Sequence, residues 1–76
     1  MNRMQTELLY AAISQYEAQA TRAEANLRVY LNRVAGVAEH PDAVGEVMEF
    51  AGTIATAKDN IRVLHEFLSD AKDTTA

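Results

Sequence analysis

Residues 9–37 read LYAAISQYEAQATRAEANLRVYLNRVAGV, and apolar residues recur through this stretch at steps that alternate between four and three. This apolar stripe consists of Leu9, Ile13, Tyr16, Ala20, Ala23, Leu27, Tyr30, Val34 and Val37. Such spacing is the a/d repeat of a helix that packs along one side against a partner helix. We therefore predict a long helix over about residues 3–38, with Asn2 as its N-cap.

A second apolar stripe with the same spacing lies beyond Pro41. It consists of Val47, Phe50, Ile54, Ala57, Ile61, Leu64, Leu68 and Ala71. This pattern predicts a second helix over about residues 42–71, followed by a frayed polar tail over residues 72–76.

The break between the helices is marked by Gly36 and Pro41. Glycine is common just after a helix, and proline suits the first position of the next one. We predict a turn over about residues 36–42 and place Asp42 in the first turn of the second helix, where its charge favours the helix N-terminus. One continuous helical rod is the alternative, which these two residues disfavour.

The two stripes match when the chain folds back on itself, so that Tyr30 meets Phe50 and Ala23 meets Ala57. The fold class that we predict is all-α, with one domain formed by an antiparallel two-helix hairpin. Glu24 and Arg28 are four residues apart and should form an ion pair along the first helix.

Charge and composition narrow the class of protein. The net charge is −4, with +1 in residues 1–38 and −5 in residues 39–76, and there is no cysteine. Disulfides and thiolate metal sites are thereby excluded. The apolar run over residues 8–13 is too short to span a membrane and lacks the features of a signal peptide. We expect a cytoplasmic protein that does not contact membranes.

Apolar residues outside the stripes exceed what a two-helix contact requires. We take five of them as candidate interface residues: Met4, Leu8, Met48, Val63 and Phe67. A chain of this size rarely builds a sufficient core alone, so we predict a homodimer that forms a four-helix bundle. Docking onto a different protein is the second possibility, and isolated exposed apolar residues at Val63 and Phe67 are the third.

His65-Glu66-Phe67 resembles the phosphoacceptor segment of sensor histidine kinase dimerisation domains. The resemblance implies that His65 accepts a phosphoryl group. It covers these three residues, and the basic and proline positions that usually follow are replaced by Leu68, Ser69 and Asp70. That family also carries its phosphoacceptor on the first helix, whereas His65 lies in the second. We interpret His65 as a residue that flanks the stripe.

No other pattern indicates a reaction or a cofactor. The Glu-x-x-His motif of diiron bundles is absent because Arg62 stands three residues before His65. Asp42, Glu46 and Glu49 are explained by a solvated helix start, and His40 lies in the predicted turn. We therefore expect no enzyme activity, no metal and no cofactor.

Nucleic acid is the alternative partner, through Arg22, Arg28 and Arg33 of the first helix. On an acidic chain these arginines make a poor electrostatic footprint. The sequence favours a small non-catalytic protein–protein interaction module, such as an adaptor, assembly factor or inhibitor, that acts as a homodimeric bundle. The alternative is a regulatory helical dimer that binds nucleic acid.

Overall fold

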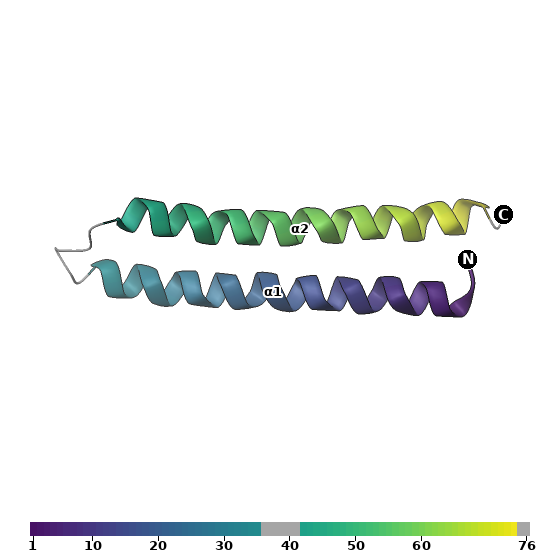
Figure 1. The fold of residues 1–76 in the computed structure, drawn as a ribbon, viewed down its shortest axis with the longest axis horizontal. Coiled ribbons are helices and arrows are strands. Elements are labelled where there is room, and N and C mark those ends of the chain that lie inside the picture. Colours follow the sequence, from purple (N-terminus) through teal and green to yellow (C-terminus); the bar gives the residue numbers. More distant parts are fainter. Residues whose placement is uncertain (36–41, 75–76) are drawn as a thin grey trace.

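The computed structural model describes residues 1–35 and 42–74. Two long helices, α1 (Arg3–Ala35) and α2 (Ala43–Thr74), run antiparallel side by side (Figure 1). Ala35 and Asp42 lie at one end, which we call the turn end, and Met1 and Thr74 lie at the other. The molecule measures 59 × 15 × 13 Å. An all-α hairpin is confirmed, and the described residues contain no strand.

The N-terminus of α1 is closed by reciprocal hydrogen bonds between Asn2 and Gln5. The Gln5 backbone N–H donates to Asn2 Oδ1 at 2.8 Å, and the Asn2 N–H donates to Gln5 Oε1 at 2.9 Å. This arrangement satisfies two backbone donors that lack partners within the helix. Asn2 is therefore the N-cap, as predicted, whereas residues 36–38 of the predicted helix lie outside the described residues.

The start and the end of α2 both differ from the prediction. Asp42 is the N-cap rather than a first-turn residue, because its Oδ1 accepts the backbone N–H of Gly45 at 3.2 Å. Helix α2 continues to Thr74, so residues 72–74 are helical and not part of a frayed tail. No glycine or proline follows Ala71 to stop the helix. Of the predicted turn, residues 36–41 lie outside the described residues.

The contact between the helices follows the predicted stripes. Among the described residues the buried side chains are those of Ile13, Ala20, Ala23, Ala57 and Leu68, all of which are stripe positions. Ala57 is the most buried, at 2% exposed. The rings of Tyr30 and Phe50 lie 5.8 Å apart between centroids, at an angle of 49°. This pair confirms the register that the sequence predicted at the turn end.

Candidate functional site

A shallow groove runs along one long edge of the hairpin, between the two helices. It consists of three adjoining hollows of about 290, 560 and 140 Å3, which have Thr53 in common. Polar side chains from both helices line it: Gln19, Arg22, Asn26, Glu46, Glu49, Thr53 and Thr56. We call this side of the molecule the groove edge.

Two of the three hollows lie beside small buried residues. Ala23 of α1 and Ala57 of α2 are both buried and both line the groove. A methyl side chain fills little of the space beside the contact, and the larger Phe50 lines two of the hollows. The alanines that allow the helices to pack closely therefore also leave an open channel beside the contact.

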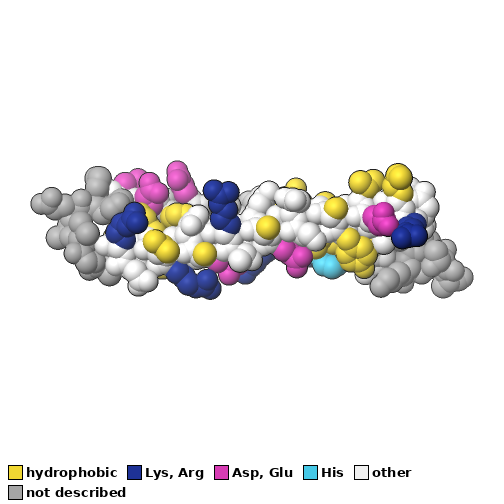
Figure 2. Space-filling view, turned by 90° about the horizontal axis from the view of Figure 1, so that it is seen from below, with side chains coloured by type: hydrophobic (Ala, Val, Ile, Leu, Met, Phe, Trp, Pro, Cys, Tyr) yellow, Lys and Arg dark blue, Asp and Glu magenta, His cyan; other side chains and the backbone are white. Residues whose placement is uncertain are grey.

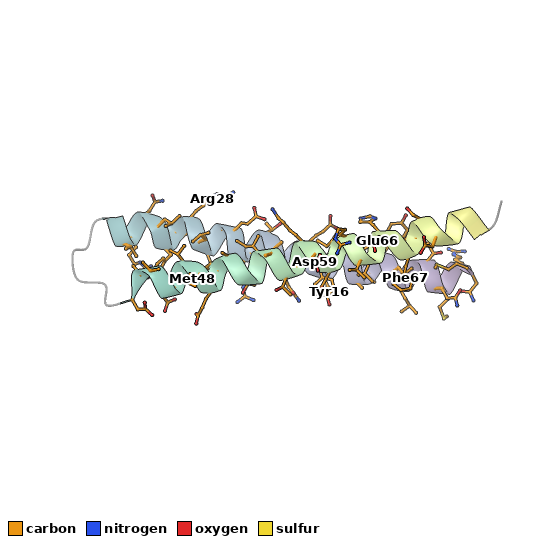
Figure 3. All side chains as sticks on the ribbon, turned by 90° about the horizontal axis from the view of Figure 1, so that it is seen from above. Tyr16, Arg28, Met48, Asp59, Glu66 and Phe67 are labelled. Carbon is orange, nitrogen blue, oxygen red and sulfur yellow. The ribbon has the colours of Figure 1, made fainter. Side chains whose placement is uncertain are left out.

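Helix periodicity extends the groove edge beyond the hollows. Positions seven residues apart lie on nearly the same line of a helix. Arg33 therefore lies in line with Asn26, and Phe67 lies fourteen residues beyond Thr53. Phe67 is 58% exposed and stands on the opposite edge from Arg28 (Figure 3). The groove edge thus carries Arg33, Glu46 and Glu49 near the turn, together with the exposed Val29, and the large exposed ring of Phe67 near the chain ends.

The apolar end of the groove edge gathers most of the predicted interface residues. Leu8 lies fourteen residues before Arg22 and is 65% exposed, and Met4 is one helical turn away and also exposed. Val63 lies seven residues beyond Thr56, on the same edge, but it is half-buried. Leu8, Val63 and Phe67 therefore share one end of the groove edge, and Met4 lies next to Leu8 on the outward face of α1.

Met48 belongs to a different surface near the turn. It is 67% exposed, and Val44 and Leu31 beside it on this edge are also exposed. Helix periodicity aligns Met48 with Arg62 and aligns Val44 with Lys58, so these residues lie on the edge opposite the groove. The five predicted interface residues consequently form two patches, at opposite ends of opposite edges.

Ion pairs within the described residues all lie away from the groove. Glu24 of α1 pairs with Arg28 at 3.9 Å and with Lys58 of α2 at 3.7 Å. Arg62 pairs with Asp59 and Glu66, and near the N-terminus Arg3 pairs with Glu7. We call this side the paired edge, because its charges are largely neutralised within the chain.

The charges of the groove edge lack such partners. Arg22 and Arg33 on α1, and Glu46 and Glu49 on α2, make no ion pair with any described residue. Acidic and basic side chains stand near one another along the turn-ward part of one edge (Figure 2). On the groove edge the α1 charges are all basic and the α2 charges are all acidic, so the two helices present opposite signs.

Tyr30 is a stripe residue that lies near the acidic residues Asp42 and Glu46 at the start of α2. Partial burial raises the pKa of the Tyr30 hydroxyl above its ordinary value, and the negative charges of Glu46 and Asp42 raise it further. Both acids oppose formation of a phenolate, since like charges repel. The start of α2 is therefore an electronegative region.

The other candidate residues from the sequence are not brought together. Arg28 lies on the paired edge with Glu24, whereas Arg22 lines the groove, so the three arginines named for nucleic acid form no continuous surface. His65 is exposed, seven residues beyond Lys58 along the paired edge. Across the residues that the structure describes, no three His, Asp or Glu side chains are placed to hold a metal ion. His40 lies outside the described residues.

Sequence reasoning missed the groove and its unpaired charges. The sequence does contain a usable signal, which is the sign of the charges at positions next to the apolar stripe. At these positions α1 carries the basic Arg33 and α2 carries the acidic Glu46, and the predicted register places the two at about the same level. The hollows themselves carry no sequence motif, because they result from alanines that also read as ordinary contact residues.

Comparisons with known proteins do not identify a family. No protein-family model, no curated protein and no solved structure matches the chain. Neither helix, over its described residues, is long and apolar enough to cross a membrane.

Proposed function

We propose that the chain is a small non-catalytic protein–protein interaction module that works as a homodimer, in which two hairpins form a four-helix bundle. Large hydrophobic side chains exposed on both edges carry this proposal. Phe67, Leu8 and Met48 each expose more than half of their surface to water. Exposed apolar side chains in clusters are typical of protein contacts.

The size of the exposed surface supports association. The accessible surface is 5825 Å2, whereas a compact monomer of 8.4 kDa exposes about 4600 Å2 by the usual scaling with mass. The excess is roughly 1200 Å2, which exceeds the ~800 Å2 that each partner buries in a standard interface. A second hairpin is the simplest surface that covers this excess.

The small core also supports dimerisation. Three of the five buried side chains among the described residues are alanines, which bury little apolar area. Burial of apolar area supplies about 25 cal/mol per Å2, so a single seam of this kind stabilises the hairpin weakly. Packing a second hairpin against the first would add the apolar area that the monomer lacks.

Within this proposal the dimer is the working unit of an adaptor, assembly factor or inhibitor. The surfaces left outside the bundle are then available to other proteins. A cytoplasmic location, which the cysteine-free sequence favours, is part of the proposal. Nucleic acid fits less well, since Arg28 is paired within the chain and lies on a different edge from Arg22, which lines the groove.

Thermal unfolding followed by circular dichroism tests the proposal, because dimerisation makes the melting temperature depend on protein concentration. We expect the helical signal to melt at a higher temperature as concentration rises, by several degrees over a hundredfold range. A matched measurement on Phe67→Ser should show a smaller dependence. A melting temperature that is independent of concentration, in a fully helical protein, would contradict the homodimer.

A further inference from the structure

We propose that the second copy packs on the groove edge, with both turns at the same end of the bundle. This inference rests on the proposed homodimer and adds its face and orientation. Each hairpin would then lay α1 on α2 of the other copy. The partner that the groove recognises is thus another molecule of the same chain.

The distribution of charge selects the edge. On the paired edge, Arg28, Lys58 and Arg62 already have acidic partners in the chain, so a second protein gains little there electrostatically. On the groove edge, Arg33 and Glu46 have none among the described residues. Unpaired charges at a surface favour a partner of complementary charge, which also fixes register.

The same charges select the orientation. Two identical edges can face each other about a twofold axis in two ways. An axis along the hairpin places α1 on α2 of the other copy, with both turns together. An axis across the hairpin places α1 on α1 and α2 on α2, with the turns apart. Only the first arrangement sets Arg33 of α1 against the acidic residues Glu46 and Glu49 of α2.

The register makes this match specific near the turn. Tyr30 lies level with Phe50, and Glu24 lies level with Lys58 through their ion pair. By this register Arg33 lies level with about residues 47–49 of α2. A twofold axis along the hairpin leaves each residue at the same height along the long axis of the molecule. Arg33 of each copy would therefore lie close to Glu46 and Glu49 of the other. Symmetry forms this contact twice.

The same register also brings apolar residues of the two copies together near the chain ends. Phe67 lies level with about residues 13–15 of α1, close to Ala12, whose small side chain faces the same edge by periodicity. The Phe67 ring of one copy would therefore cover the region around Ala12 of the other. The polar residues Gln19, Asn26, Thr53 and Thr56 would line the interior between the charged and the apolar ends, where they can bond across the interface.

Charge reversal tests the edge. In Arg33→Glu the two copies place acidic residues against acidic residues, and in the double variant Glu46→Lys/Glu49→Lys they place basic against basic. We expect each variant alone to dimerise about tenfold more weakly or worse. A mixture of the two variants restores both contacts, so heterodimers should form with affinity near that of the original homodimer.

Arg28→Glu is the matched control, since it makes the same charge change on α1 but on the paired edge. We expect it to dimerise like the unchanged chain, with circular dichroism confirming that all variants are helical. Equal dimerisation of Arg33→Glu and Arg28→Glu, or no gain on mixing, would overturn the groove edge as the interface.

A distance measurement tests the orientation. The chain has no cysteine, so Val44→Cys introduces a single site for a spin label at the turn end of the paired edge. With the turns together the two labels should lie within about 30 Å, because neighbouring helices in a bundle are ~8–10 Å apart. With the turns apart they should lie roughly 45 Å or more apart, given the helix rise of ~1.5 Å per residue.

The outcomes separate this inference from the homodimer. A short distance, together with recovery in the mixture, supports the arrangement described above. A long distance between labels in a confirmed dimer would overturn the orientation and leave the homodimer standing. A folded monomer in the unlabelled, unchanged chain would overturn both proposals.

Discussion

Single alanines control how the two helices meet. Ala20, Ala23 and Ala57 are buried at stripe positions where larger residues would normally stand. Their size lets the backbones approach closely, and it also leaves the groove beside the contact open. A residue type that reads only as a good helix former thus determines both the packing distance and the shape of the surface.

Ala57→Leu should destabilise the hairpin by about 1–3 kcal/mol, because three extra carbon atoms must enter a closely packed position. Ala57 is 2% exposed, so its side chain has no path toward solvent without moving the helices apart. Urea unfolding measures the change. Ala25→Leu, at an exposed position of α1, is the control and should change stability by less than about 0.5 kcal/mol. Equal stabilities for both variants would contradict the register.

Gly52→Ala should stabilise the protein by about 0.5–1 kcal/mol, since alanine costs less conformational entropy in a helix than glycine. A Cβ atom at Gly52 would meet nothing within 4 Å. At Gly45, by contrast, a Cβ would collide with the Asp42 carboxylate that caps α2. Thermal unfolding should show a smaller gain, or a loss, for Gly45→Ala, and the reverse order would contradict this account of the cap.

We predict that the stability of the folded protein falls at alkaline pH because of Tyr30. Its pKa is raised in the folded protein, so folding favours the protonated hydroxyl. The resulting stabilisation is fully present below the ordinary tyrosine pKa of 10.0 and is lost as pH rises through the folded-state value. Tyr30→Phe should therefore lose less stability between pH 9 and pH 11, in urea unfolding, than the unchanged chain. Parallel losses would show that other groups dominate.

Both helices begin with a side-chain N-cap, but the two caps should contribute unequally to the stability of the hairpin. Asn2 caps α1 at the chain end, and Asp42 caps α2 next to the turn. Fraying at Asn2 affects only the first turn of α1. Loss of the Asp42 cap affects the segment that holds Phe50 against Tyr30. The cap of α2 should therefore contribute more to the stability of the hairpin.

Asp42→Ala should destabilise the hairpin by about 0.5–2 kcal/mol, because the backbone N–H of Gly45 loses its acceptor and the helix start loses a favourable negative charge. Asn2→Ala is the comparison and should cost less. Denaturant unfolding of both variants checks the order. A larger cost for Asn2→Ala would mean that the open end, rather than the turn end, limits stability.

The sequence was sufficient to predict both helices and their pairing, because apolar spacing reports directly which side of a helix is buried. It located Asn2 as a cap and the Glu24–Arg28 pair. It misplaced Asp42 and the end of α2, since caps depend on one hydrogen bond and nothing after Ala71 marks a boundary. Helix boundaries are the least defined part of such a pattern.

The candidate surface was less predictable than the fold. Exposure at Met4, Leu8, Met48 and Phe67 followed from their positions outside the stripes, whereas Val63 is half-buried. The division into two edges could not be inferred from a list of residues, because it depends on which charges find partners across the hairpin. Lys58 pairs with Glu24, while Arg33 has no ion pair with a described residue.

The hairpin is long and thin, at 59 × 15 × 13 Å. Its surface is large for its mass, its buried side chains are few and small, and its two edges differ in how far their charges are satisfied. A second hairpin on the groove edge would cover part of the exposed surface, add buried apolar area and place opposite charges together. In our proposal the dimer, rather than the single chain, is the functional unit.

Sedimentation equilibrium across a hundredfold range of protein concentration, with circular dichroism on the same samples, measures whether the chain forms a dimer. We predict a helical species of twice the 8.4 kDa chain mass that dissociates only on dilution. A helical, cooperatively folded species of 8.4 kDa at every concentration would contradict it, because the single hairpin would then be stable without covering its exposed surface.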